Sequence, residues 1–334
     1  MEIALAYNDD HSLAAGEADD SAAVEGVLEQ VGAVEEACRQ LGHEPRRVPA
    51  GRDLGPVVAA LSQPRPDLVF SMVESVGGDA RLEPAFAYLL EWLLLPYTGS
   101  PPLALALALH KPLARHVLAG AGVAVPSGVV LERADDPLEG FRYPVIVKPS
   151  REDGSHGIRS ESVVQDEASA RARAAYVIER YAQPALVEDF VPGRELNVSL
   201  LGPADAPVVL PLRELRYDLA PGLPEVVGYE AKWLPESPQF RGTTPVPAEL
   251  EPALAESVAA TACAAYAALG LRDYGRVDVR LGEGDGPLVI DVNPNPALTP
   301  GMTGLPGAAA AAGMSYTDVV GFVLDQALAR SRFA

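Results

Sequence analysis

Two short segments near the end of the chain place the strongest constraint on its fold. Residues 276–281 alternate strictly between charged and apolar, and the last residues of the segment 288–293 continue this pattern. A period of two is typical of a β-strand with one buried face, so Arg276, Asp278 and Arg280 lie on one side. A glycine-rich stretch separates the two segments and predicts a hairpin loop. The chain therefore contains an antiparallel pair of strands with a charged face.

The register of this hairpin brings two carboxylates together. If the strands pair symmetrically about the loop, Asp278 faces Asp291 and Arg276 faces Asn293. Opposed side chains lie ~4.5–5.5 Å apart, and like charges at that distance are destabilising unless a cation lies between them. Mg²⁺ prefers oxygen ligands of this kind, so Asp278, Asp291 and Asn293 are the candidate metal ligands. The alternative is a solvated polar face on which Arg276 and Arg280 balance the acids.

The first hundred residues predict a parallel α/β layer. Apolar segments at 2–7 and 67–73 have the length of buried strands, and residues 22–41 and 83–94 show helical periodicity. Strands that alternate with helices are typical of parallel sheets. The turn-rich stretch 96–102 then predicts the end of this layer.

The rest of the chain mixes short strands with helices. Beyond a helical stretch that ends near Gly120, strands are predicted at 127–131, 143–147 and 158–163, and a helix at 168–180. An antiparallel sheet is predicted from residues 185–190, 195–201 and 208–216, and further helices from 250–269, 308–312 and 317–329. Residues 217–247 are rich in Pro and Gly and have no clean period. A loop of that length inside a compact protein is often a functional lid.

Charge and hydropathy exclude several classes of function. Lys and Arg total 26 and Asp and Glu total 46, which gives a net charge of −20. Nucleic-acid binding needs clustered basic residues, so this balance argues against nucleic acid and against an anionic membrane surface. No apolar run reaches the ~18–20 residues of a membrane helix, and the N-terminus lacks the basic region of a secretory signal. We expect a cytoplasmic protein in which Cys38 and Cys263 are free thiols.

Three lysines, Lys111, Lys148 and Lys232, stand beside 23 arginines. Lys presents a compact ammonium where Arg presents a planar fork, so these lysines are candidates for sites that need a point charge. Lys148 ends a predicted strand and precedes a loop that contains Ser155 and two glycines. Such a loop can direct backbone N–H groups at phosphate oxygens, with the lysine as counter-charge. The alternative is an ordinary hairpin, and the loop lacks the Walker A pattern.

Two acids seven residues apart, Glu188 and Glu195, flank an apolar segment and a turn. Glu188 and the backbone beyond it are suited to a purine edge, and Glu195 is suited to ribose hydroxyls. The spacing alone is not specific, because acids on an edge strand would look the same.

Together these motifs resemble the ATP-grasp superfamily, and within it the D-alanine–D-alanine ligase group. The resemblance covers nearly the whole chain, and the motifs follow in the family's order. They are Pro96–Ser100 followed by Lys111, Tyr143–Ser150, Glu188 with Gly193–Glu195, Glu230–Lys232, Arg276–Asp278 and Asp291–Asn293. All three lysines fall on positions that contact the nucleotide in that family.

The resemblance implies a three-domain α/β and α+β architecture in which ATP lies between two antiparallel sheets. It divides the chain into an N-terminal α/β domain (1–100), a central subdomain (101–185) and a C-terminal subdomain (186–334) with a lid loop at 217–247. The nucleotide contacts that it implies are Lys111, Lys148, Glu188, Phe190, Val191, Glu195 and Lys232.

The resemblance also implies a metal centre and a reaction. Asp278, Asp291 and Asn293 would bind Mg²⁺, as two ions, with Mn²⁺ as an alternative metal. The implied catalytic residues are Arg276, Lys232 and Ser155, with Arg276 stabilising a tetrahedral oxyanion. A carboxylate would attack the γ-phosphate to form an acyl phosphate, and an amine would then displace phosphate to give an amide.

Several departures from the family pattern predict altered substrates. A glycine-rich turn with Ser and Glu is replaced by residues 8–13, and Glu74 replaces a histidine. Trp233 stands for the lid tyrosine, and the Gly-Met-Thr run that begins at Gly301 lacks the serine that usually follows. Asp291 stands where such ligases usually carry Glu. We expect Glu74 to contact a cationic or amino group and Gly301 to contact substrate, although Glu74 could equally be a surface acid.

The expected partners are small carboxylate and amine substrates, amino acids or their derivatives. Two other functions fit the nucleotide motifs: a small-molecule kinase without amide formation, and a non-catalytic nucleotide-binding module. A homodimer is expected from the resemblance, but no residue pattern specifies an interface.

Overall fold

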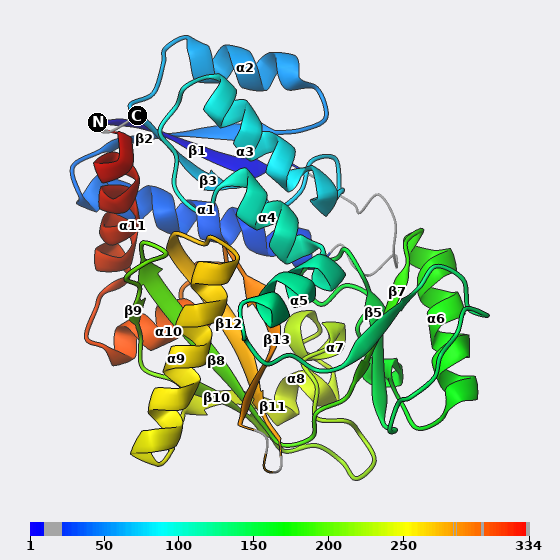
Figure 1. Cartoon of the computed structure of the whole chain (residues 1–334). Helices are drawn as coiled ribbons and strands as arrows, with labels where there is room; N and C mark the ends of the chain where they lie inside the picture. Colours follow the sequence, from blue (N-terminus) through cyan, green and yellow to red (C-terminus); the bar gives the residue numbers. More distant parts are fainter. Residues whose placement is uncertain (10–21, 283, 285, 302–303, 332–334) are drawn as a thin grey trace.

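The computed structural model describes residues 1–9, 22–282, 284, 286–301 and 304–331. Its N-terminal layer is a three-stranded parallel sheet in which β1 (Glu2–Asn8) lies between β2 (Glu44–Ala50) and β3 (Leu68–Met72). α1 (Ala22–Gln40) packs on one face, and α2 (Leu54–Ser62) and α3 (Glu83–Trp92) pack on the other (Figure 1). The predicted parallel α/β layer is confirmed.

Strand β1 explains why this layer has two apolar faces. Successive side chains of a strand point to opposite sides, and a parallel strand buried on both sides is apolar throughout. Ile3 and Leu5 pack toward α1, whereas Ala4 and Ala6 pack toward α2 and α3. A short 3₁₀ helix (Ala80–Leu82) precedes α3.

The C-terminal part is built on a six-stranded antiparallel sheet. Its strand order is β11-β10-β8-β12-β13, and β9 also pairs with β8. The strands are β8 (Arg194–Gly202), β9 (Val208–Val209), β10 (Arg213–Tyr217), β11 (Thr243–Pro247), β12 (Asp273–Leu281) and β13 (Pro287–Asn293). α9 (Pro252–Ala268) covers one face. α10 (Gly304–Ala311) and α11 (Tyr316–Ser331) join the N-terminal layer to this sheet.

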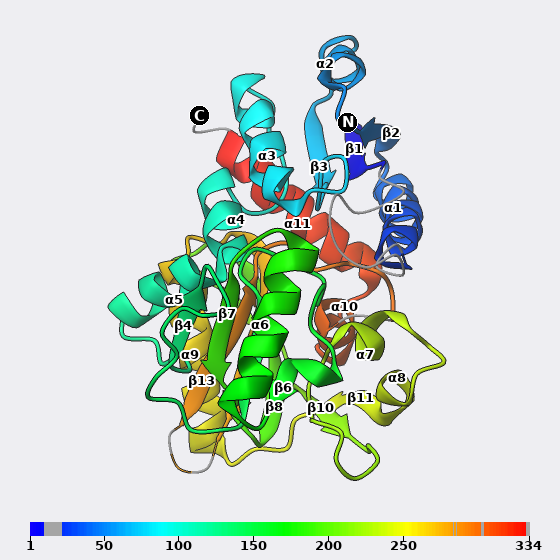
Figure 2. The same cartoon turned by 90° about the vertical axis from the view of Figure 1, so that its right-hand side faces the viewer.

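The central part carries a second antiparallel sheet. Its order is β4-β7-β5-β6, with strands Gly128–Leu131, Ala185–Asp189, Val145–Pro149 and Val163–Val164 in that order. α6 (Glu167–Tyr181) covers its outer face, as Figure 2 shows. α4 (Pro102–Leu109) and α5 (Lys111–Gly120) lead into this sheet and are separated by His110, whose side chain caps α5.

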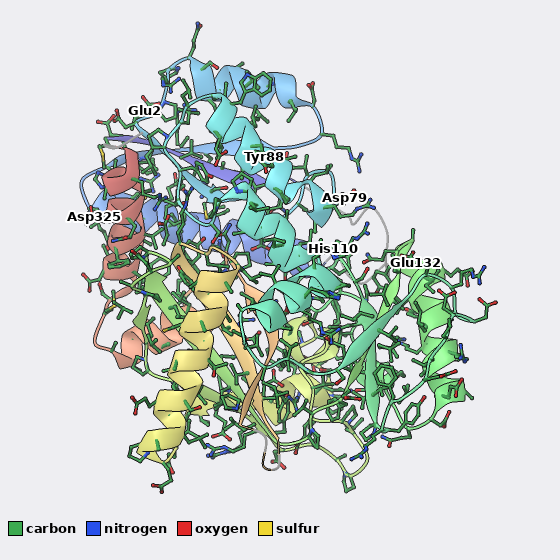
Figure 3. All side chains as sticks on the ribbon, viewed as in Figure 1. Glu2, Asp79, Tyr88, His110, Glu132 and Asp325 are labelled. Atoms are coloured by element: carbon green, nitrogen blue, oxygen red, sulfur yellow. The ribbon has the colours of Figure 1, made fainter. Side chains whose placement is uncertain are left out.

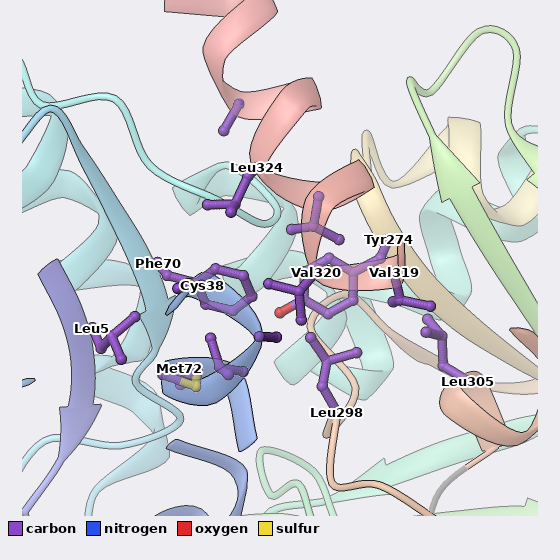
Figure 4. Packing of buried hydrophobic residues seen from close by; sticks show 14 of the residues in the cluster. Leu5, Cys38, Phe70, Met72, Tyr274, Leu298, Leu305, Val319, Val320 and Leu324 are labelled. Atoms are coloured by element: carbon purple, nitrogen blue, oxygen red, sulfur yellow. The ribbon is translucent and has the colours of Figure 1, made fainter. Parts of the chain in front are cut away.

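The N-terminal layer and the C-terminal sheet share one hydrophobic core. Phe70 and Met72 of β3 meet Tyr274 of β12 and Leu298, with α11 closing the cluster (Figure 4). The four-stranded sheet instead packs its own residues against α6 in a separate core. The six-stranded and four-stranded sheets therefore pack into separate hydrophobic cores.

Some sequence predictions are wrong in detail. The strand predicted at 158–163 is a turn, a 3₁₀ helix (Ser160–Ser162) and the two-residue β6. The strand predicted at 208–216 is divided into β9 and β10. The stretch 217–247 contains α7 (Tyr229–Trp233), α8 (Pro238–Gly242) and β11 rather than loop alone.

The predicted sheet of residues 185–190, 195–201 and 208–216 is also wrong in its grouping. β7 pairs with β4 and β5 in the four-stranded sheet, whereas β8, β9 and β10 belong to the six-stranded sheet. We propose that the central subdomain extends through Asp189, because the expected boundary at 185/186 would separate β7 from its partners.

Within the described residues, no single helix is long and apolar enough to cross a membrane. Only α10 and α11 taken together meet that criterion of length and composition, and they are bent by 106°.

Candidate active site

One cavity of about 450 Å³ lies between the two antiparallel sheets. Ligand pockets of ~300–1,000 Å³ are typical of small-molecule sites. Every residue proposed from the sequence except Glu74 lines it. These residues are Lys111, Lys148, Ser155, Glu188, Phe190, Val191, Glu195, Lys232, Arg276, Asp278, Asp291, Asn293 and Gly301. The cavity therefore brings together residues that lie far apart in the sequence.

The hairpin register predicted from the sequence is confirmed at the site. Arg276 pairs with Asn293 and Asp278 pairs with Asp291 across β12 and β13. Beyond Asp278 a β-bulge shifts the register, so Val279 pairs with Val289 and Ile290 is the extra residue. Ile290 also lines the cavity.

Asp278 is held from three directions. Arg276 donates Nε to Oδ1 at 2.7 Å and Nη2 to Oδ2 at 2.9 Å. The amides of Asn197 and Asn293 donate to the same carboxylate at 2.8 and 3.0 Å. Burial opposes the charge on Arg276, but Asp278 outweighs it and raises the pKa of the guanidinium above its usual value. Arg276 is thus held in its charged form beside this carboxylate.

The side chain of Asp291 accepts a hydrogen bond from a lysine. Lys111, the first residue of α5, is 8% exposed and donates Nζ to Asp291 Oδ1 at 3.1 Å. Its backbone N–H is fixed by the Ser150 carbonyl at 3.0 Å. Burial lowers the pKa of Lys111, but the carboxylates of Asp291 and Asp153 outweigh it, so the pKa is raised. Each of the two facing acids therefore has its own cation.

Glu188 is occupied by cations rather than open to a ligand. Its side chain forms ion pairs with Lys148 Nζ and with Arg115 Nε, the latter at 2.8 Å. Both Lys148 and Glu188 are almost fully buried. The carboxylate therefore positions Lys148, while the backbone of Phe190 and Val191 lines the cavity beside it.

The lid, residues 217–247, lies against the loop that follows Lys148. Ser155 Oγ donates to the Val227 carbonyl at 3.1 Å, and Trp233 Nε1 donates to the Gly154 carbonyl at 2.8 Å. The backbone N–H of Tyr229 donates to the Ile158 carbonyl at 2.7 Å. This places Lys232 in the cavity, where burial and the nearby Arg276 lower its pKa while Asp153 opposes them.

Glu74 lies just beyond β3, and its backbone N–H donates to Asn8 Oδ1 at 3.3 Å. Glu74 is exposed, yet desolvation by the surrounding protein and the charge of Asp153 raise the pKa of its carboxyl to about 7, while Lys232 lowers it. Gly301 lines the cavity with a left-handed backbone, φ +73°. The neighbouring Met302 and Thr303, and most of the stretch 8–13, lie outside the described residues.

Sequence reasoning missed two charged residues of the cavity. Asp153 lines it, and Lys232 and Lys111 lower its pKa against the effect of burial. Arg280 was placed on the correct face by the alternation but assigned only to charge balance; it lies at the end of the cavity that holds Glu195. Asp153 could have been found from the sequence, because it lies in the polar loop that follows Lys148.

Comparisons with known proteins agree with this geometry. The family model described as D-ala D-ala ligase C-terminus matches residues 118–325. A D-alanine–D-alanine ligase of Gluconobacter oxydans is 34% identical over 302 residues, which cover 88% of this chain and 92% of that protein. The chain belongs to the D-alanine–D-alanine ligase family. It is thus an ATP-grasp ligase of the class that forms C–N bonds.

Two further comparisons concern an uncharacterized relative and a solved structure. The uncharacterized protein y4sG of Sinorhizobium fredii is 31% identical over 296 residues, covering 87% of this chain and 85% of that protein. The crystal structure of D-alanine–D-alanine ligase from Bacillus anthracis complexed with ATP superposes with a TM-score of 0.74 at 20% identity. It covers 100% of this chain and 99% of that one, which confirms the ATP-grasp fold.

Proposed function

We propose that this ligase joins a carboxylate to an amine through an acyl phosphate, with ADP and phosphate as products, and that its substrates are not two D-alanine molecules. One observation carries the chemistry. Arg276, the opposed acids Asp278 and Asp291, and the lysines Lys111 and Lys232 all meet in one cavity between two sheets. Binding a nucleotide without chemistry would not need a partly buried arginine beside the acids.

ATP fits the polarity of this cavity. Lys111, Lys148 and Lys232 supply three cations for the phosphates, and a strip of backbone at Phe190 and Val191 adjoins an apolar wall suited to adenine. Glu195 stands at the same end for ribose. Burying charged lysines is costly unless an opposite charge is present. Three lysines in one largely buried cavity therefore favour a polyanionic ligand.

Mg²⁺ fits the donor set of Asp278, Asp291 and Asn293. No group of three or more His, Cys, Asp and Glu residues suited to a metal occurs in the described parts of the chain. Two carboxylates and one amide oxygen are nevertheless the set that Mg²⁺ takes when phosphates complete its shell. We propose two ions, with Mn²⁺ as an alternative; bound there, they would supply charge neutralisation for phosphoryl transfer.

The proposed reaction has two steps, and different residues assist each of them. A substrate carboxylate attacks the γ-phosphorus, the bond to the bridging oxygen breaks, and ADP leaves. The amine attacks the acyl carbonyl, phosphate leaves, and the amine loses a proton. Arg276 is placed to stabilise the oxyanion of that step. The lid, held by Ser155 and Trp233, excludes water that would hydrolyse the acyl phosphate.

The residue at position 74 supports a changed substrate specificity. Glu74 replaces a histidine of the family pattern and shares its electrostatic environment with Asp153 and Lys232. An added carboxylate near the reacting groups favours a substrate that carries an amino or other cationic group at this point. An ATP-consuming reaction on small metabolites also agrees with the predicted cytoplasmic location.

Replacing Glu74 by Gln is expected to raise the KM of the amine-bearing substrate about tenfold or more, because a hydrogen bond to a charged group contributes ~1.5–3 kcal/mol. The KM of ATP should stay within about twofold. In the wild type, that substrate's KM should rise as the pH falls through about 7, since protonation removes the charge of Glu74, and E74Q should lose this dependence. Unchanged KM values in steady-state kinetics would remove Glu74 from the substrate site.

Hydroxylamine tests the acyl phosphate. With ATP, Mg²⁺ and a single carboxylic acid, the enzyme should form the corresponding hydroxamate, which mass spectrometry detects, because hydroxylamine replaces the amine substrate. A stable phosphorylated product that hydroxylamine leaves intact would instead indicate a small-molecule kinase.

We also propose that the chain forms a homodimer through α3 and α4. These helices pack side by side on one side of the molecule, and Tyr88 lies on the outer side of α3 (Figures 1 and 3). Trp92 is 87% exposed, Leu94 81% and Leu103 63%. With Tyr88 they offer on the order of 500 Å² of exposed side-chain surface, most of the ~800 Å² per partner of a standard interface. The stretch 92–109 contains no Asp, Glu, Lys or Arg, so this part of the face carries no charge that would repel a second copy of the acidic chain. The exposed Glu91 lies at its border.

Trp92→Asp is therefore expected to convert the dimer to monomer in light scattering at micromolar concentration. Exposed Leu28 of α1, changed to Asp, is the matched control and should leave the mass unchanged. A wild-type protein that is monomeric at all concentrations, or a W92D dimer, would contradict the interface.

A further inference from the structure

Arg280 is the most heavily engaged side chain at the Glu195 end of the cavity. It lies on β12 with 3% of its surface exposed. Its Nη2 contacts Glu195 Oε2 at 2.5 Å and also donates to the Glu225 carbonyl of the lid. Its Nη1 donates to the carbonyls of Val191 at 3.0 Å and Gly193 at 3.4 Å.

These bonds leave the guanidinium little capacity for a ligand. Arg carries five N–H donors, and four hydrogen bonds from Nη1 and Nη2 already go to protein acceptors. The guanidinium carbon also lies 5.2 Å from the ring centre of Phe190 and 6.0 Å from that of Tyr217. Arg280 is therefore built to hold protein groups in place rather than to bind phosphate.

The group that it holds has one oxygen free. Glu195 is 5% exposed and lines the cavity. Tyr217 Oη donates to the same Oε2 at 2.8 Å, so both donors meet one oxygen. No donor from the described part of the chain reaches Oε1. A buried carboxylate fixed through one oxygen, with the other unoccupied beside a cavity, is oriented to accept hydrogen bonds from a ligand hydroxyl.

We infer that Arg280 is a positioning residue that sets selectivity for the sugar of the nucleotide. It fixes Glu195 so that Oε1 accepts from the ribose hydroxyls, and its bond to Glu225 links that orientation to the lid. The inference rests on the proposed ATP site but adds a determinant that discriminates a ribonucleotide from a deoxynucleotide. A lysine could keep the charge at this position, but it has no planar fork to hold Glu195 and the two loop carbonyls together.

Equilibrium titration with ATP, 2′-deoxy-ATP and 3′-deoxy-ATP tests this without knowledge of the other substrates. The wild type should bind ATP about tenfold to a hundredfold more tightly than at least one deoxy analogue, as expected for a hydroxyl bonded to a carboxylate. Arg280→Lys should reduce this ratio to within about twofold. Arg194→Lys, which alters the partly buried pair with Glu214 on the same sheet, is the matched control and should keep the ratio.

The ratio of the affinities for ATP and its deoxy analogues separates a positioning role of Arg280 from a purely structural one. A merely structural role would weaken all three nucleotides alike, so a preserved ratio in R280K would overturn the inference. Should R280K fail to fold, Tyr217→Phe removes the second donor on Oε2 and should lower the ratio severalfold; an unchanged ratio there would also overturn it. A wild type that binds ATP and both analogues equally contradicts the inference alone, whereas a wild type that binds no ATP contradicts the proposed function.

Discussion

Replacing Asp291 by Ala is expected to lower kcat for ADP formation by ~10³-fold. Metal ions supply several kcal/mol of charge stabilisation in phosphoryl transfer, and each ~1.4 kcal/mol is a factor of ten in rate. Asp291 also pairs with the buried Lys111, so its loss leaves that cation without its nearest carboxylate. Steady-state ADP release at saturating ATP measures the effect.

The shape of the site can be kept while the charge is removed. Asp291→Asn should raise the Mg²⁺ concentration needed for half-maximal activity at least tenfold. Glu256→Ala, at an exposed acid of α9, should change neither kcat nor this Mg²⁺ concentration. Thermal unfolding of both variants controls for stability. ADP formation by D291A at the wild-type rate and the wild-type Mg²⁺ requirement would show that Asp291 is not a metal ligand.

Arg276→Lys is expected to lower kcat by ~10²–10³-fold with little change in the KM of ATP. Removing one preorganised oxyanion donor costs about this much in other acyl-transfer enzymes. Lysine keeps the charge, but it cannot reproduce the two bonds of 2.7 and 2.9 Å that Arg276 makes to Asp278. The loss should appear in the step that consumes the amine.

Hydroxamate formation separates the two steps in this variant. R276K should still form the acyl phosphate, because the lysines of the phosphate site are intact. Arg216→Lys, on an exposed position of β10, is the control and should behave as wild type. An R276K enzyme with normal kcat for amide formation would exclude Arg276 from the catalytic set.

The sequence predicted the centre of the site because its chemistry is local. Period-two alternation and one short loop are enough to place Asp278 opposite Asp291, and the structure has this pair. The same argument fails one residue further on, since a bulge at Ile290 shifts the pairing at Val279. Nothing in the residue pattern marks that bulge, which depends on how the strands pack around the cavity.

Predictions that depend on which hydrogen bonds the folded chain makes were weaker. The segment 158–163 has apolar ends and was expected to be a strand, but Ser162 Oγ accepts from the Arg159 N–H at 3.0 Å and favours a turn. The partners of Arg280 come from residues 191–195 and 225, far away in the sequence. Alternation placed Arg280 on the cavity face, but only the folded chain shows what it holds.

ADP release from the purified protein distinguishes amide formation with changed substrates from its alternatives. ATP and Mg²⁺ would be supplied with amino acids of both hands, singly and in pairs, with D-alanine included. We expect release only with a particular carboxylate and amine, and no release with D-alanine alone. Release with D-alanine alone would contradict the changed specificity, and release with one compound that lacks an amine partner would contradict the ligase reaction itself.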